Sequence, residues 1–250
     1  MTFLEGIPAV LPRGEAILME NLRFWPGEEE NDLEFAKKLA KLGDFYVNDA
    51  FAVCHRENAS VTRLPKLLPS YAGFLLEKEI NTLKAVMEKP EKPLVLILGG
   101  SKIEDKAPVI KNLLPKTARV LLGSIALNDS HAVPKSKKVT IPVDWVAEGN
   151  LAFDIGPKTI EAYGKEISKA KTIIWNGPVG KFEDEKYLKG SLAITKSVAA
   201  SSAFSVVGGG ETTQLILQTG FRKKIGFLST GGGAMLEFLA GKKLPGIEAL

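Results

Sequence analysis

The stretch Leu94-Val-Leu-Ile-Leu-Gly-Gly-Ser-Lys102 decides the fold, because a short apolar run ends there in a glycine turn. An uninterrupted apolar run of this length predicts a strand buried on both faces, as in a parallel sheet. Three more predicted strands end in such turns: Trp175-Asn-Gly-Pro-Val-Gly180, Val207-Gly-Gly-Gly-Glu211 and Ser229-Thr-Gly-Gly-Gly-Ala234. Since parallel strands end at one edge of their sheet, we expect all four turns where open α/β sheets bind ligands.

Strands alternate with amphipathic helices along this part of the chain. The predicted strands are Leu94–Leu98, Arg119–Leu122, Val139–Ile141, Thr172–Trp175, Phe204–Val207 and Ile225–Leu228. The predicted helices are Glu104–Leu114, Pro157–Lys169, Asp184–Ala200, Glu211–Thr219 and Ala234–Ala240. The alternation predicts an α/β fold: a three-layer parallel sheet with helices on both faces, Rossmann-like, together with a reduced N-terminal α/β portion.

The N-terminal residues 1–73 contain only two predicted strands, Ala16–Met19 and Phe45–Val47, beside a predicted helix at Asp32–Leu42. Two strands are too few for an independent α/β core. We therefore expect this region to pack on a partner, on a second copy or on the rest of the chain. The apolar residues Phe3-Leu4 and Ile7-Pro-Ala-Val-Leu11 are the predicted patch for such self-association.

Composition excludes several classes of protein. The 250 residues are 45% hydrophobic and 25% charged, which excludes a disordered or collagenous chain. The single cysteine, Cys54, excludes an intramolecular disulfide and a zinc site built from cysteines. The formal charge is only +4, and the lysines at 135, 137 and 138 are read as a solvated loop, so no nucleic-acid partner is expected. The absence of a basic leader and of a long apolar run predicts a cytoplasmic protein without a membrane partner.

The glycine turns favour a phosphorylated ligand, because glycine lets the backbone approach closely and helix N-termini offer N–H groups to anions. None of the turns matches the Walker or the dinucleotide pattern. Lys102 and Lys106 are expected on one face of a helix that begins after Gly100, where they could neutralise a transferring phosphoryl group. Glu211 could hold Mg²⁺. A surface lysine pair and a favourable first-turn charge are the alternatives for these residues.

Further motifs occur beside the glycine turns. They are Glu20-Asn-Leu-Arg-Phe24, Asn48-Asp-Ala-Phe51 with His55-Arg56, Asp154-Ile-Gly-Pro157, Phe182-Glu183 and Leu244-Pro-Gly-Ile247. In these motifs and in their order, from about Glu15 to Leu250, the sequence resembles phosphoglycerate kinases. The resemblance implies reversible phosphoryl transfer between 1,3-bisphosphoglycerate and ADP, giving 3-phosphoglycerate and ATP, with Mg²⁺ as cofactor.

The resemblance also implies a hinge enzyme whose two domains close over the reaction. Its expected parts are residues 1–73 on the phosphoglycerate side, 74–92 as interdomain helix and hinge, 93–240 as nucleotide-binding domain, and 241–250 as C-terminal tail. Closure in such an enzyme excludes water and so protects the phosphoryl group from hydrolysis.

Residue by residue, the resemblance implies these roles. Arg23 and Arg56 bind phosphoglycerate, Lys102 lies near the transferring phosphoryl group, and the helix start at Gly232 and Gly233 faces the transfer centre. Glu183 binds ribose hydroxyls, and Glu211 stands where the family has a metal-linked aspartate. The remaining nucleotide-binding residues are Gly100, Ser101, Lys106, Asn176, Gly180, Gly209, Gly210 and Thr212.

Two segments of the family pattern have no counterpart in this sequence. The first segment comprises the family's first strand and a Ser-His-Leu-Gly-Arg-Pro type motif, which in the family supply a catalytic arginine. The second is the segment that follows the position of Leu122. Transfer is therefore expected to be slow or to need a group supplied in trans. The alternative is a catalytically inactive adenine-nucleotide-binding or regulatory protein, and a general sugar-phosphate binder is the third interpretation.

Overall fold

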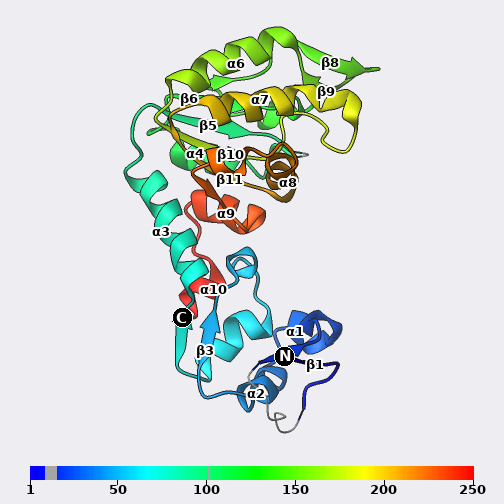
Figure 1. Ribbon diagram of the computed structural model, residues 1–250, viewed down its shortest axis with the longest axis vertical. Coiled ribbons are helices and arrows are strands. Elements are labelled where there is room, and N and C mark those ends of the chain that lie inside the picture. Colours follow the sequence, from blue (N-terminus) through cyan, green and yellow to red (C-terminus); the bar gives the residue numbers. More distant parts are fainter. Residues whose placement is uncertain (9–15, 101) are drawn as a thin grey trace. The chain divides into compact units, whose positions relative to one another are not determined.

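The sheet predicted around Leu94–Leu98 forms the centre of the larger of two units in the structure. The structure is a computed structural model that describes residues 1–8, 16–100 and 102–250. Unit 1 comprises Met1–Glu79 and Lys243–Leu250, and unit 2 comprises Ile80–Lys242 (Figure 1). No helix in the described part of the chain is long and apolar enough to cross a membrane.

In the described residues of unit 2, six strands form one parallel sheet in the order β12-β11-β10-β5-β6-β7. The strands are β5 (Leu94–Leu98), β6 (Arg119–Leu122), β7 (Val139–Thr140), β10 (Thr172–Asn176), β11 (Phe204–Gly208) and β12 (Phe227–Leu228). The chain builds outward from β5 in one direction and from β10 in the other. The gap between the carboxyl ends of β5 and β10 is thus the topological switch point, where such sheets bind ligands.

Helices cover both faces of this sheet, as predicted (Figure 1). They are α4 (Ala107–Leu113), α5 (Ile125–Asn128), α6 (Pro157–Lys169), α7 (Lys189–Ala200), α8 (Gly210–Gln218) and α9 (Gly232–Leu239). Val95 and Ile97 pack in a cluster with residues of α6, α7 and α8. Leu94, Leu96 and Leu98 alternate with them and therefore point to the opposite face, where they are fully buried as well. The fold class predicted from the sequence is confirmed.

Two predicted helices begin later than expected. The helix predicted at Glu104 begins at Ala107, because Ile103–Lys106 form a turn and Pro108 fits the first helical turn. Lys102 and Lys106 therefore do not share a helical face, and that prediction is wrong. The helix predicted from Asp184 begins as a 3₁₀ helix at Glu185–Tyr187, since the Asp184 side chain accepts a hydrogen bond from the Lys186 N–H, and α7 follows from Lys189.

An antiparallel hairpin that was not predicted precedes α6. It consists of β8 (Trp145–Glu148) and β9 (Leu151–Ile155), with a positive φ at Gly149 in its turn.

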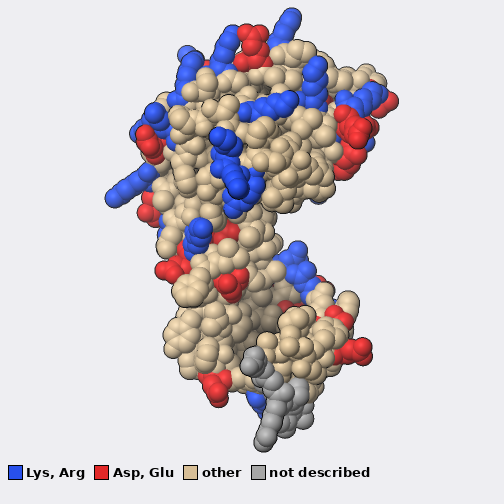
Figure 2. All heavy atoms as spheres, in the orientation of Figure 1, with Lys and Arg blue, Asp and Glu red and all other residues tan. Residues whose placement is uncertain are grey.

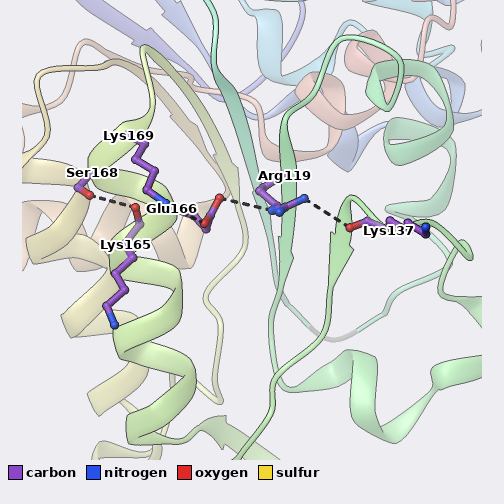
Figure 3. Close-up of polar contacts among 6 residues, drawn as sticks. All are labelled: Arg119, Lys137, Lys165, Glu166, Ser168 and Lys169. Atoms are coloured by element: carbon purple, nitrogen blue, oxygen red, sulfur yellow. Dashed lines mark hydrogen bonds and ion pairs between the residues drawn. The ribbon is translucent and has the colours of Figure 1, made fainter.

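An ion pair connects α6 to the amino end of β6. Glu166 of α6 pairs with Arg119 of β6 at 3.4 Å, and Arg119 also donates to the Lys137 carbonyl (Figure 3). Both ion-pair partners are partly exposed, so this contact contributes little to stability.

Unit 1 contains more strands than predicted. Among its described residues there are four: β1 (Thr2–Leu4), β2 (Ile17–Met19), β3 (Tyr46–Asn48) and β4 (Ser70–Ala72). They form two separate parallel pairs, β1–β2 and β3–β4. The expectation of two strands is therefore wrong: β1 and β4, of three residues each, were missed. Of the predicted apolar patch, residues 9–11 lie outside the described part of the chain.

Short helices complete unit 1. They are α1 (Pro26–Glu29), α2 (Leu33–Ala40), the first turns of α3 (Phe74–Glu88), α10 (Pro245–Glu248), a π-helical turn (Ala59–Arg63) and the 3₁₀ turns Leu22–Phe24, Phe51–Val53 and Leu64–Lys66. Asp49 accepts hydrogen bonds from the N–H groups of Leu75 and Leu76 and so caps α3. Gly246 of α10 donates to the Cys54 carbonyl at 2.9 Å.

Candidate functional site

The turns after β5 and β10 lie against each other at the switch point. Gly99 donates to the Asn176 carbonyl at 3.0 Å, and Gly100 donates to the Pro178 carbonyl at 2.8 Å. Gly100 and Gly177 have φ values of 94° and 85°, and a Cβ atom at Gly99 would collide with the Pro178 carbonyl oxygen. Only glycine permits this close crossing of two backbones.

The loop from Gly177 to Gly180 is held by side chains behind it. Trp175 Nε1 donates to the Gly177 carbonyl at 2.8 Å. Ser191 Oγ, on the buried side of α7, accepts from the N–H groups of Val179 and Gly180 at 3.0 and 3.3 Å. Ser191 was not predicted, because a lone serine eleven residues beyond the loop carries no motif. The hydrogen bonds fix the backbone that the ligand would meet.

The third and fourth glycine turns reach the same place. α8 begins at Gly210, after Gly209 with a φ of 97°, and α9 begins at Gly232. Asn176 Nδ2 donates to the Gly232 carbonyl at 3.3 Å, and a Cβ atom at Gly232 would lie 2.8 Å from Gly209 Cα. The structure thus brings all four glycine turns together at one edge of the sheet.

Two cavities adjoin at this edge, and both are lined by Gly100, Pro178 and Glu211. The first, here called the glycine cavity, has about 390 Å³ and is lined by Gly100, Lys106, Asn176, Gly177, Pro178, Gly209, Gly210, Glu211, Thr212, Gly232, Gly233 and Leu236. The second, here called the hairpin cavity, has about 240 Å³ and is lined by Gly100, Ser124, Ile125, Asn128, Ala152, Phe153, Pro178, Gly180, Lys181, Phe182, Glu183 and Glu211. The first is lined mainly by glycines, together with Lys106, Glu211 and Thr212, whereas the second has apolar and aromatic walls.

Lys106 and Glu211 are the charged side chains in the described lining of the glycine cavity. Lys106 is only 8% exposed, and burial lowers the pKa of its ammonium group, against the opposing effect of Asp105 and Glu211. The pKa of Glu211 is raised by burial and by Glu183, while Lys106 acts in the opposite direction. A partly desolvated cation beside two helix N-termini favours an anionic ligand.

Thr212 gives independent support for a ligand in the glycine cavity. Its side chain is fully buried at the first turn of α8, and its Oγ1 atom has no hydrogen-bond partner among the described residues. A buried hydroxyl without a partner is costly. A ligand oxygen in the cavity would provide the missing partner.

The other predicted site residues are distributed as follows. Gly180 and Glu183 line the hairpin cavity, and Gly232 and Gly233 line the glycine cavity. Lys102 is exposed in the coil before Ile103 and is absent from the described lining of both cavities. Ser101 lies outside the described residues. Arg23 and Arg56 belong to unit 1, where both are exposed and neither forms an ion pair with a described residue.

A magnesium ion fits the residues present. No group of three or more His, Cys, Asp or Glu side chains that could cage a metal occurs among the described residues. Magnesium, however, is commonly held by one or two carboxylates together with substrate phosphates and water. Glu211 is the carboxylate at the border of the two cavities and could serve in this way.

The apolar wall of the hairpin cavity was not predicted. It is formed by Ile125 of α5, Ala152 and Phe153 of β9, and Phe182. The Phe153 ring lies 4.9 Å from the Tyr187 ring, and Lys181 Nζ lies 5.5 Å from the Phe153 centroid. Because β9 was not recognised as a strand, no sequence signal placed its residues beside the glycine turns.

Comparison with known proteins gives one consistent family. The family model described as phosphoglycerate kinase matches residues 5–128 and 123–242. A phosphoglycerate kinase from Leptospira biflexa serovar Patoc is 42% identical over 285 residues, covering 96% of this chain and 72% of that protein. One from Moorella thermoacetica is 40% identical over 292 residues, covering 99% of this chain and 74% of that protein.

Solved structures agree with the sequence matches. Phosphoglycerate kinase from Coxiella burnetii has a TM-score of 0.82 at 33% identity and covers 99% of this chain, which spans 76% of it. The enzyme from Pyrococcus horikoshii OT3 has a TM-score of 0.85 at 34% identity, covering 96% of this chain and 73% of its own.

Proposed function

The chain belongs to the phosphoglycerate kinase family, and we propose residue roles for the reaction of that family. The reaction is the reversible transfer of a phosphoryl group between 1,3-bisphosphoglycerate and ADP, which gives 3-phosphoglycerate and ATP. The chain is thus a phosphotransferase with a carboxyl group as acceptor, and it uses adenine nucleotide as a substrate. Its residues at the sheet edge are proposed to act in the following way.

The nucleotide phosphates would occupy the glycine cavity. There the N–H groups at the starts of α8 and α9 face anions, and the Thr212 hydroxyl gains a partner. Asn176 and the loop that ends at Gly180 would hold the phosphates from the β10 side. The base and ribose would occupy the hairpin cavity, with Glu183 at the ribose hydroxyls.

Mg²⁺ is proposed to bind Glu211 together with the nucleotide phosphates, whose negative charge it neutralises when bound. Glu211 is longer by one methylene than the aspartate expected from the family pattern. Its position at the border of the two cavities supports this role, because a carboxylate there reaches toward the region between base and phosphates. Lys106 balances its charge.

Phosphoryl transfer needs no protein nucleophile, because positioning and electrostatic stabilisation supply most of the catalysis. Lys106 would contact the nucleotide phosphates. Because its side chain is almost fully buried, little water would screen the attraction between its charge and the phosphates. Lys102, two residues beyond Gly100, would hold the transferring group, with the α9 N-terminus at Gly232 and Gly233 facing the same charge. Arg23 and Arg56 would bind the carboxylate and phosphate of 3-phosphoglycerate, as guanidinium forks do.

The observation that carries the proposal is the meeting of four glycine turns around the buried Lys106. It is tested by a coupled assay with 3-phosphoglycerate, MgATP and a downstream dehydrogenase. Turnover should fall strongly in Lys102→Ala and Lys106→Ala and be kept in Lys111→Ala, an exposed lysine of α4. Full turnover in the first two variants would contradict the assigned roles.

Three expectations from the sequence stay predictions. They are a cytoplasmic location, the absence of nucleic-acid and membrane partners, and self-association through the N-terminal portion. On the face drawn in Figure 2, acidic side chains lie among the lysines and arginines, which does not favour a nucleic-acid partner.

A further inference from the structure

Asn128, the last residue of α5, is joined to β9 by a pair of hydrogen bonds. Its Nδ2 donates to the Ala152 carbonyl at 2.9 Å, and its Oδ1 accepts from the Ala152 N–H at 2.9 Å. The carboxamide thus pairs with β9 as the backbone of a neighbouring strand would. Among the described residues, no other hydrogen bond connects α5 with β9.

These hydrogen bonds join the two walls of the hairpin cavity. Ser124, Ile125 and Asn128 line it from one side, and Ala152 and Phe153 line it from the other. Phe153 follows Ala152 directly, and its carbonyl accepts from the Lys181 N–H at 2.7 Å. The position of Ala152 therefore sets the position of the aromatic ring and of the loop that carries Lys181, Phe182 and Glu183.

The wall on the α5 side is anchored at its start, where the Ser124 N–H donates to the Val179 carbonyl at 2.8 Å, and Asn128 anchors its end. α5 is a single turn of four residues, and isolated helices of this length are unstable. The two segments that match the family model, 5–128 and 123–242, overlap at this turn, so α5 lies where they join. A single turn needs tertiary contacts to hold its place, and Asn128 provides the contact that joins it to β9.

We propose that Asn128 is a positioning residue for the nucleoside part of the nucleotide: it holds α5 and β9 at the separation that the base requires. The proposal rests on the proposed function, because it takes the hairpin cavity to be the base site. The Asn128 amide is already used by Ala152, so its effect on the ligand is indirect. The glycine cavity does not include Asn128 in its described lining, and phosphate binding is independent of it.

The test compares two probes, MgADP and inorganic tripolyphosphate with Mg²⁺, in titration calorimetry on the full chain. Asn128→Leu has nearly the same size but forms neither hydrogen bond. Its Kd for MgADP should rise about 10-fold, as expected for the loss of one or two hydrogen bonds, while its Kd for tripolyphosphate should stay within about 2-fold of the wild type. Asn150→Leu, the same change at an exposed position in the hairpin turn, should leave both values unchanged.

Steady-state kinetics gives a second readout. In Asn128→Leu, the KM for MgATP should rise, while kcat and the KM for 3-phosphoglycerate should stay near their wild-type values. A general loss of structure would weaken the binding of both probes and lower kcat, and this result would overturn the proposal. Unchanged MgADP affinity would overturn it as well.

Measurements on the wild-type protein distinguish a failure of the proposed function from a failure of this inference. If the wild type binds neither probe, the proposed function fails, and the inference fails with it. If the wild type binds both probes and the variant binds MgADP with the wild-type Kd, only the inference fails. Should Asn128→Leu not fold, Asn128→Ala removes the same two bonds without adding apolar surface, and the same comparison of probes applies.

Discussion

Units 1 and 2 both use parallel strands, but they cover these strands very differently. In unit 2, every residue of β5 is buried between two layers of helices. In unit 1, the register partners Phe3 and Leu18 of β1–β2 are 51% and 50% exposed, and Val47 and Tyr71 of β3–β4 are 47% and 58% exposed. Parallel sheets are normally covered on both faces, so the two pairs in unit 1 resemble sheet fragments.

The difference extends to the cores. The unit 2 cluster joins four strands of the sheet, among them Ile97 of β5 and Trp175 of β10, to three helices. A unit 1 cluster consists of Phe35, Ala36, Leu39, Ala59 and Leu64, which lie on short helical segments. Since burial of apolar surface is the main stabilising contribution, we infer that unit 1 opens more easily than unit 2.

The largest expected effect tests this inference with one truncation in each core. Trp175→Ala removes a fully buried side chain and leaves the Gly177 carbonyl without its donor, so it should destabilise unit 2 by about 3–5 kcal/mol. Phe35→Ala truncates a core side chain of unit 1 and should destabilise unit 1 instead. Hydrogen exchange should show lost protection in β5 and β10 for the first variant and in α2 for the second.

Cys54 provides a reporter of unit 1 for the same experiment. Its thiol is buried, and burial raises its pKa to about 11, so alkylation at neutral pH should be slow in the wild type. Phe35→Ala should accelerate alkylation, whereas Trp175→Ala should leave it near the wild-type rate. Equal acceleration by both variants would mean that the two units unfold together.

The second prediction separates the chemistry of the two units. Lys106→Ala in unit 2 should lower kcat about 10²-fold, because it removes the buried cation that is proposed to contact the nucleotide phosphates. Arg56→Ala in unit 1 should mainly raise the KM for 3-phosphoglycerate, by about 10-fold or more, since a charge-assisted hydrogen bond contributes about 1.5–3 kcal/mol.

Exposed lysines serve as controls in these kinetics, Lys111→Ala in unit 2 and Lys41→Ala in unit 1. Both control variants should have the kcat and KM values of the wild type. If Arg56→Ala changed only the KM for MgATP, the assignment of phosphoglycerate to unit 1 would be wrong.

The same contrast explains how far the sequence predicts the structure. β5, β6 and α6 have the predicted bounds, because fully buried strands are continuous apolar runs and Pro157 marks a helix start. The four glycine turns were predicted to share one edge, since this follows from parallel strand order alone. The three-residue strands of unit 1 were partly missed, because they are too short for periodicity to show.

Site residues that act through tertiary contact could not be predicted. Ser191 and Asn128 hold loops through hydrogen bonds to residues 11 to 24 positions away, and neither belongs to a motif. Lys106 was placed on a helix, but a turn precedes α4 and puts its side chain at the glycine cavity. Local patterns thus gave the framework of the site, whereas its supports depend on the packing of unit 2.

A pH-dependent contribution is expected from the buried Asp154 of unit 2. Its carboxylate accepts from the N–H groups of Gly190 and Ile155, yet burial raises its pKa from 3.8 to about 6. A carboxyl group with a higher pKa in the folded state binds its proton more tightly there, so protonation stabilises the fold. This contribution is fully present below pH 3.8 and is lost as the pH rises through about 6.

Asp154→Asn removes this titration. Its free energy of unfolding, measured by urea denaturation between pH 4 and 7, should lack the decline with rising pH that Asp154 gives the wild type. The asparagine side chain has one oxygen for the two N–H donors, Gly190 and Ile155, so the variant should be less stable than the wild type at every pH. Only the slope of the unfolding free energy against pH therefore tests the role of Asp154. An identical slope in both proteins would show that Asp154 is not the titrating group.

The smallest effect on folding is expected from the exposed faces of unit 1. Phe3→Lys with Tyr71→Lys should change the free energy of unfolding by no more than about 0.5 kcal/mol for each residue, as usual for surface positions. If these faces mediate self-association, the same double variant should lower the average mass in sedimentation equilibrium, while Val143→Lys, an exposed apolar position in unit 2, should not. A wild-type protein that sediments as a monomer would show that paired strands with one apolar face exposed persist in water without a partner. The small core around Phe35 would then be sufficient for unit 1, and the contrast with unit 2 would concern its stability alone.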